Sequence, residues 1–433
     1  MESNYFVKEV KLVANESSSK ALKEFGKDGF DISGGNPRIS YFESIFSPSI
    51  SITLSDILDV DQFVSRYGLT GGEYLKIKVQ ISKQAADEGQ KDFEINVEDH
   101  KLVLNKVSDI TTTSLKQLAS LEFVSVESIV NETARLSKKF DGNFSDIVED
   151  ILTKDKRGIQ TTKKFNTERR SSNPFRDRSL NKYTFVGNLK RPFDTINWLS
   201  PKAASDKEDC GFLFFENHDG YHFRSIKKLL EQKPKKKYRR LDKNLYETDS
   251  LNILDARVSR TNDIGMNLRI GTYANRTIYV DLENQQRTVV DYKISDNTGI
   301  KNPPKLPEKL DEHPSRLMLR LVDPGAMQKG SKKSDKQKDS ELAKYQNKSY
   351  ARNNLLNSYS MNVTVPFNTD LRAGDIIEIK LPYKSDDKTT KSGKTDFTDV
   401  SGNYLISKLR HEINSDRNSS THLEIIRDTF SAK

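Results

Sequence analysis

The chain has 433 residues, enough for two to four domains with cores of their own. Hydrophobic residues make up 34% and charged residues 31%, so we expect modest cores and much polar surface. The net charge of +9 is compatible with acidic partners or nucleic acid. A single cysteine, Cys210, excludes an intrachain disulfide and a cysteine-rich zinc site.

The N-terminal sequence has no apolar signal core, and no run of about 18 apolar residues predicts a membrane-spanning helix. We therefore expect the chain to fold in a reducing cytoplasm.

Residues 1–127 predict an antiparallel β unit. Phe6–Ala14 and Tyr41–Ile52 have strand composition, and Leu75–Ile81 alternates apolar residues with Lys76, Lys78 and Gln80, as expected of a strand with one wet face. Apolar residues within Ser55–Gly68 predict a short helix. Strands separated by turns, without alternating helices, favour a sandwich or small barrel.

Residues 128–250 predict a small α+β domain. The apolar spacing in Phe144–Leu152 predicts a helix with Ser145 as its N-cap, and Pro192 marks the first turn of a second helix. Gly211–Ile226 predicts a hairpin because Asp219-Gly220 is a strong turn signal. His218 and His222 flank that turn, so they are expected as surface residues rather than metal ligands.

The most basic run of the chain is Lys233–Arg240. One interpretation is a solvated linker between domains, and the other is a patch that contacts phosphate groups. The patch would consist of six residues: Lys233, Lys235, Lys236, Lys237, Arg239 and Arg240.

The remainder predicts a second β unit, formed by residues 251–260 and 360–433, with an inserted domain at 261–359. Ile253–Val258 is its expected opening strand, the counterpart of Val7–Leu12. The insertion contains a loop with four prolines and a lysine-rich stretch, Lys329–Lys348, expected to be mobile. The prolines are Pro303, Pro304, Pro307 and Pro314.

An internal repeat connects the two β units. Gly72 aligns with Gly374, 302 residues later, and both precede an acidic residue and an alternating strand. Lys106 aligns with Lys408, and Leu121–Val124 with Leu423–Ile426, at the same offset. A fourth strand, Ser51–Leu54, aligns with Asn362–Val365 at an offset of 311.

A long repeat period indicates two whole duplicated domains, here two similar antiparallel β units. The alternative is that the two β units are unrelated and share only residue patterns that are common to many strands. The predicted fold class is α+β, mainly β, with the smaller α+β domains inserted or appended.

The sequence contains no phosphate-binding, dinucleotide-binding, zinc-protease or serine-hydrolase motif. Paired carboxylates of a glycosidase cannot be judged from sequence because their separation is unknown. We therefore predict that the protein is not an enzyme and has no cofactor, no metal and no catalytic residue.

Five segments resemble, in order, the baseplate central hub protein of contractile-tailed phages of the T-even type, a family related to the hub domains of secretion-system spikes. They are Tyr41–Leu54, Phe193–Ala203, Gly211–Ile226, Leu371–Pro382 and Ser401–Ile413. None of them is an active-site signature, and the lysine-rich and proline-rich segments have no counterpart in the resemblance.

The resemblance implies that each chain contains two similar antiparallel β-barrels of the tube type. It also implies a homotrimer in which these barrels form a pseudo-six-fold ring in the tail baseplate of a virion, assembled in the host cytoplasm. Such a ring would adapt the six-fold tail tube to a three-fold central spike, which carries the lysozyme in many related tails. Tube or tube-initiator proteins, baseplate wedge proteins and the tape-measure protein would be further partners, and DNA would pass in transit.

Sliding contact in such a channel favours mixed charge. Lys76, Lys78, Glu378 and Lys380, on the wet faces of two matching strands, are the candidate lumen or partner-facing residues. Three other functions stay open: the hub of a non-phage injection system, a nucleic-acid-binding module that uses Lys233–Arg240, and a cell-wall hydrolase.

Overall fold

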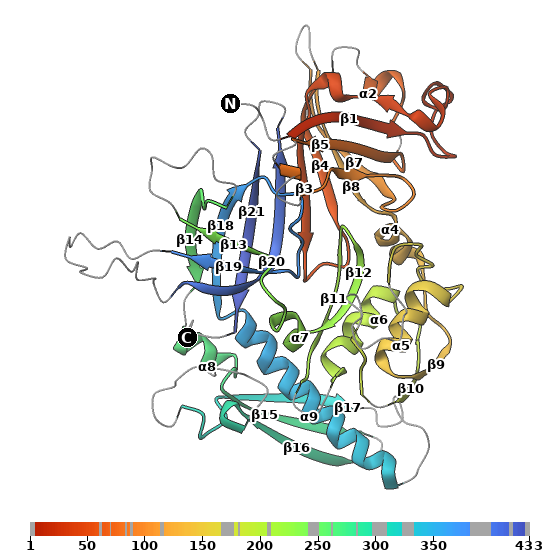
Figure 1. Cartoon of the computed structure of the whole chain (residues 1–433). Helices are drawn as coiled ribbons and strands as arrows, with labels where there is room; N and C mark the ends of the chain where they lie inside the picture. Colours follow the sequence, from red (N-terminus) through yellow and green to blue (C-terminus); the bar gives the residue numbers. More distant parts are fainter. Residues whose placement is uncertain are drawn as a thin grey trace, which may run out of the picture.

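A computed structural model of the chain describes residues 5–59, 63–69, 71–82, 85–86, 90–112, 117–165, 177–180, 182–205, 209–240, 251–260, 263–282, 285–296, 310–322, 333–381, 400–414 and 419–428. Most of the described strands form one 14-stranded, largely antiparallel sheet, with helices, two two-stranded sheets and a three-stranded sheet beside it (Figure 1). The predicted α+β class, mainly β, is confirmed.

The N-terminal half of the large sheet contains eight of the described strands, and three short helices belong to the same described part of the chain. The strands are β1 (Tyr5–Val13), β2 (Phe30–Asp31), β3 (Arg38–Ser44), β4 (Ser51–Asp59), β5 (Tyr74–Ile81), β6 (Phe93–Ile95), β7 (Leu102–Thr112) and β8 (Gln117–Ser125); the helices are α1 (Lys20–Lys23), α2 (Phe63–Arg66) and α4 (Val126–Thr133). In β5, Leu75, Ile77 and Val79 are buried while the intervening lysines are half-buried, so the predicted alternation is confirmed.

The C-terminal half of the large sheet contains six strands from distant parts of the chain. They are β13 (Lys236–Arg239), β14 (Asp255–Arg260), β18 (Tyr359–Pro366), β19 (Ile376–Lys380), β20 (Gly402–Ile413) and β21 (Ser420–Arg427).

The two halves have the same strand order. The first runs β3-β4-β8-β7-β5-β1 and the second β14-β18-β21-β20-β19-β13. Cα partners repeat at the predicted offset of 302: Tyr74 faces Val103 as Ile376 faces Leu405. Likewise, Lys106 faces Glu122 as Lys408 faces Glu424, and both pairs follow an irregularity in the register at the same place.

Two details of the predicted repeat are wrong. Ile52 faces Phe123 while Met361 faces Ile425, so the fourth strand repeats at an offset of 309, not 311. The counterpart of β14 is β3, because each pairs with the strand that follows it in the order; β13 takes the place of β1, although it lies parallel to β19 whereas β1 is antiparallel to β5.

Strand pairing among the described residues does not close either half into the predicted barrel. The sheet path runs openly from β14 to β2. Instead, the halves join edge to edge: β20 pairs with β3 from Lys408 opposite Ser44 to Ile413 opposite Ile39.

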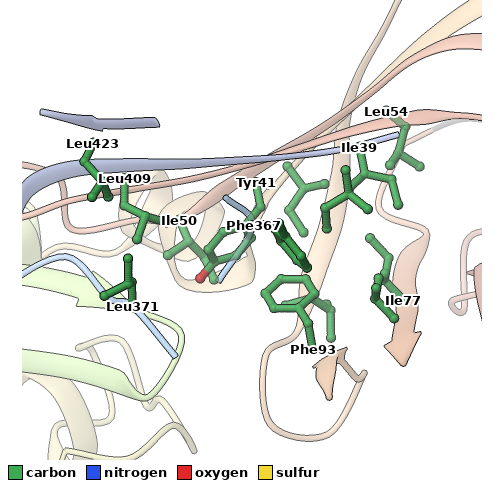
Figure 2. Close-up of a cluster of buried hydrophobic side chains, with 14 of the residues drawn as sticks. Ile39, Tyr41, Ile50, Leu54, Ile77, Phe93, Phe367, Leu371, Leu409 and Leu423 are labelled. Carbon is green, nitrogen blue, oxygen red and sulfur yellow. The ribbon is translucent and has the colours of Figure 1, made fainter. Parts of the chain in front are cut away.

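A continuous hydrophobic core crosses this junction. Figure 2 shows buried side chains of the first half, among them Ile39, Tyr41 and Phe93, beside Leu409 and Leu423 of the second. Because one core serves both halves, the junction is held by packing as well as by the main-chain ladder.

The repeated glycine before each acidic residue has a conformational cause. Gly72 and Gly374 have φ angles of +87° and +93°, which favour glycine. Their amides donate to the carbonyl oxygens of Leu104 at 2.7 Å and Ile406 at 2.9 Å, positions 302 residues apart. The glycine therefore lets each loop turn tightly onto the neighbouring strand.

A compact α+β part lies beside the junction. Its strands are β9 (Lys139–Gly142), β10 (Tyr183–Val186), β11 (Phe212–Asn217) and β12 (Gly220–Ser225); its helices are α5 (Phe144–Glu149), α6 (Pro192–Leu199) and α7 (Ile226–Leu230). Pro192 lies in the first turn of α6, and β11–β12 form the hairpin, both as predicted. The N-cap of α5 is Asn143 rather than Ser145, and α5 continues into a π-helix, Asp150–Lys154.

The residues after β14 form α8 (Ile264–Arg269), the sheet β16-β15-β17 and α9 (Lys333–Leu356). The strands are β15 (Ala274–Asp281), β16 (Gln286–Lys293) and β17 (Arg316–Val322). Most of the lysine-rich stretch is helical, because it belongs to α9, whose Tyr345 and Asn347 are buried. Pro303, Pro304 and Pro307 lie outside the described residues. None of the described helices is long and apolar enough to cross a membrane.

Candidate functional site

A buried carboxylate fixes the junction between the halves. Glu43 of β3 is fully buried; its Oε1 accepts hydrogen bonds from the Tyr41 hydroxyl at 2.6 Å and the His218 amide at 2.7 Å. Its Oε2 accepts from the Ala373 amide at 2.7 Å. Burial raises the pKa of Glu43, and the charge of Arg372 opposes that shift. One side chain thus connects β3, the β11–β12 turn and the loop before β19.

A second buried ionic cluster connects the α+β part to the first half. The Lys163 ammonium lies 2.5 Å from Glu216 Oε1 and 2.8 Å from Glu127 Oε2, and all three side chains are at most 3% exposed. Burial alone would lower the pKa of Lys163, but the two carboxylates raise it above its usual value. Glu216 Oε2 also accepts from the Ser125 hydroxyl at 2.7 Å. The cluster therefore cross-links segments from β8, β11 and the chain between them.

A pocket of about 310 Å³ opens between these clusters. Burial, reinforced by His218 and Lys163, lowers the pKa of His100 to about 3, and the His100 and His218 rings lie 4.4 Å apart. Lys163 is held as a charged partner of two carboxylates, and no described group of three or more His, Cys, Asp or Glu residues could hold a metal ion. His218 and His222 lie in the folded junction, not on the expected surface: His222 is buried and its Nε2 lies 2.8 Å from Asn217 Oδ1.

The four predicted lumen or partner-facing residues lie on equivalent strands in the two halves. On β5, Lys76 pairs with Glu9 at 3.4 Å and Lys78 with Glu94 at 2.5 Å. On β19, Glu378 pairs with Lys237 at 3.2 Å and with Lys380 at 3.4 Å. Each strand face is therefore a mixed, internally paired set of charges.

The basic run is a sheet strand rather than a linker. Lys236–Arg239 forms β13, whose Tyr238 is fully buried. Lys235 pairs with Asp375 at 3.1 Å and with Asp370 at 3.5 Å, and Lys237 pairs with Glu378. Acidic neighbours thus offset part of its charge, while Lys233 and Arg240 stay exposed. The linker interpretation is therefore wrong for Lys236–Arg239, because a basic strand can pair within a sheet when carboxylates lie on or beside the adjacent strand.

Exposed apolar side chains at three places in the described structure escaped the sequence analysis. The strand edge at β14 exposes Val258 by 38%, and the distal part of β7 exposes Ile110 by 49%. On β17, Leu317, Leu319 and Leu321 are 67–70% exposed along one face. Their alternation with Met318 and Arg320 was the available signal, but which face of an isolated strand is covered depends on the tertiary fold.

Comparison with solved structures gives the architecture. The tail protein from Neisseria meningitidis MC58 matches over 99% of this chain and 98% of that chain, with 10% identity and a TM-score of 0.50. This chain shares the fold of phage tail proteins. The 43 kDa tail protein of prophage MuSo2 from Shewanella oneidensis matches over 98% of this chain and 100% of that chain, also at 10% identity and a TM-score of 0.50.

The Francisella PdpA–VgrG complex covers 99% of this chain and 58% of that chain, at 10% identity and a TM-score of 0.44. No family model matches the sequence, and no curated protein matches it. The predicted likeness to tail proteins is therefore confirmed by the structural matches, which extend over nearly the whole chain.

Proposed function

We propose that this chain is a structural subunit of a phage tail baseplate hub, and that three copies form a pseudo-six-fold ring. The observation that carries the proposal is the repeat of the sheet within one chain, with Cα pairings reproduced 302 residues apart. The tail-protein fold over nearly the whole chain supports it.

The duplication offers a physical solution to a symmetry mismatch. Three identical chains with two equivalent halves each present six similar sheets to a six-fold tail tube, while the other parts of the chain recur three times, as a three-fold spike requires. The edge-to-edge junction of β3 and β20 within one chain supports this arrangement, because one half can follow another by the same kind of pairing.

In this ring, β5 and β19 occupy equivalent places. We propose that Lys76, Lys78, Glu378 and Lys380 face the channel or a partner that binds both halves alike. Each is already ion-paired within its own chain, so a passing nucleic acid would meet a mixed surface with few uncompensated lysines. Weak contacts of this kind suit the passage of tape-measure protein and DNA.

The domain boundaries extend the same proposal. Residues 1–127 and the pair 251–260 with 360–433 would build the ring, whereas 128–250 and 261–359 would provide attachments outside it. We propose the central spike, tube or tube-initiator proteins and wedge proteins as their partners, within the baseplate of the virion. A non-enzymatic role is consistent with the tail-protein fold.

Light scattering of the purified chain, with and without the cognate spike protein, tests the proposal. The expected result is a trimer in at least one sample and, by electron microscopy, a six-lobed ring with a central opening. A monomer in both samples, or a ring without an opening, would contradict the proposed function.

A further inference from the structure

The internal junction predicts how one copy of the chain meets the next. In the strand orders, β3 corresponds to β14 and β20 to β7. Since β3 pairs with the distal part of β20 inside the chain, the equivalent contact between chains joins β14 of one copy to the distal part of β7 in a second copy. This inference rests on the proposed function and specifies its subunit interface.

Both edges are available for such pairing. Among the described strands, β14 pairs only with β18 and ends the sheet path. On its edge away from β8, β7 has one registered strand partner in the described chain, at Val103 near its start. Within the described residues, β14 and the end of β7 beyond Ser108 therefore present main-chain edges that a second strand can satisfy.

A matching pair of bulges fixes the register. Between Ser108 opposite Ser120 and Thr111 opposite Leu118, β7 has one residue more than β8. Between Val258 and Arg260, β14 likewise has one residue more than β18.

When the internal β3–β20 register is transferred to β14 and β7, the two extra residues oppose each other and cancel. Ser108 then faces Arg260 and Thr111 faces Arg257, with two residues between them on each strand. A bulge on only one edge would interrupt the ladder, so the matched bulges also disfavour pairing with a regular strand.

We infer that β14 of one copy pairs antiparallel with residues 108–112 of β7 in the next copy, with Val258 opposite Ile110. In this register two exposed apolar side chains cover each other. The corresponding place in the internal junction holds Tyr41 opposite His411, both fully buried, with their rings stacked 5.9 Å apart. Opposed side chains therefore pack against each other at this position in both junctions.

The two edges are different surfaces, so the contact is head-to-tail and each copy uses both edges. Such a contact closes into a ring when the rotation between copies permits. Six successive half-to-half steps, three within chains and three between them, would complete the ring. Pairing of β14 with a second β14 is excluded by this scheme.

Disulfide trapping tests the register. The double variant Ile110→Cys/Val258→Cys, oxidised with glutathione disulfide, should shift most chains to a covalent trimer on a non-reducing gel, because directly opposed antiparallel residues lie within disulfide reach. Ile110→Cys/Arg257→Cys is the matched control: Arg257 adjoins Val258 but points to the other face, so little trimer should form. Native Cys210 is buried and stays in all variants.

A positive control uses the internal junction. Ser40 faces Glu412, so Ser40→Cys/Glu412→Cys should form a disulfide within one chain and leave its mass monomeric. A trimer by light scattering that gives no cross-link through Ile110 and Val258 would overturn the inferred interface while the proposed ring stands. A cross-linked dimer of the single variant Val258→Cys would also overturn it. A monomer in every sample would refute both, and a cross-linked ladder beyond three chains would support the edge pairing but refute the closed trimer.

Discussion

Replacing Lys163 with methionine tests the energetic role of the buried ionic cluster. The lysine is the shared partner of Glu127 and Glu216, which are 3% and 1% exposed. Methionine retains most of the side-chain volume but leaves two carboxylates without their cation. Losing one partner of a buried ion pair destabilises proteins by about 3–5 kcal/mol, a large part of the roughly 5–15 kcal/mol that typically separates folded from unfolded states.

The loss should depend on pH. Burial already raises the pKa of Glu216 above the usual value of a glutamate, and removing the Lys163 charge should raise it further. At low pH a carboxyl group is protonated in both the folded and the unfolded chain, so a raised folded pKa does not affect stability. As the pH rises above the pKa of the unfolded chain, the unfolded chain loses the proton more readily and the folded state is destabilised. Lys163→Met should therefore lose more stability at pH 8 than at pH 5.

Trp198 provides the assay because it is the sole tryptophan and packs against the core of the α+β part. Denaturant unfolding followed by its fluorescence should show a lower midpoint for Lys163→Met than for the wild type. Exposed Lys164 gives the matched control Lys164→Met, and Lys163→Met/Glu216→Gln should recover part of the loss. Equal midpoints for Lys163→Met and Lys164→Met would refute the argument.

Two further predictions concern the pocket and the repeated turn. Burial lowers the pKa of His100 to about 3, whereas an unfolded histidine has a pKa of about 6.5, so below pH 6.5 the unfolded chain binds a proton that the folded chain does not. The free energy of unfolding should therefore fall by about 1.4 kcal/mol for each pH unit below 6.5. His100→Asn should flatten this acid limb of the curve of unfolding midpoint against pH, and an unchanged slope would contradict the assignment. Gly374→Ala should lower the melting temperature by the equivalent of roughly 1 kcal/mol or more, because φ is +93° and the new Cβ would lie 2.9 Å from Phe215 Cζ. The control Gly34→Ala, whose Cβ would meet nothing within 4 Å, should change the melting temperature little. Similar melting temperatures for the two variants would show that the turn at Gly374 tolerates a side chain.

Local periodicity made much of the sheet predictable. Alternation in Leu75–Ile81 identified a strand and its buried face, and Gly72 and Gly374 revealed the repeat because each turn requires a positive φ. The predicted offset of the fourth strand was wrong because a segment as short as Ser51–Leu54 fits an offset of 309 or of 311 equally well. The two alignments differ by two residues, and moving a strand by two residues keeps its apolar face inward.

The candidate site depended on contacts that sequence spacing does not encode. Glu43 meets Ala373 across 330 positions and Lys163 meets Glu216 across 53, so nothing local distinguishes them from solvated charges. The pairing of Lys235 and Lys237 could not be predicted either, because their acidic partners lie more than 100 positions away, in the loop before β19 and on β19 itself. The four lumen candidates were found as the wet face of two strands, and their role as channel residues stays a prediction.

The internal junction and the inferred junction between copies should differ in strength. Within the chain, Tyr41 and His411 are fully buried, and the β11–β12 turn adds the hydrogen bonds of Glu43. Between copies, Ile110 and Val258 are partly exposed before pairing, and burying an apolar side chain of this size contributes about 1.5–3 kcal/mol at most. A strand pair of five residues must also offset the loss of translational and rotational freedom on association. The fused halves would therefore form with the folded chain, whereas ring closure would depend on concentration or on a spike that binds all three copies at once. The trimer fraction should accordingly rise more steeply with added spike than with added chain.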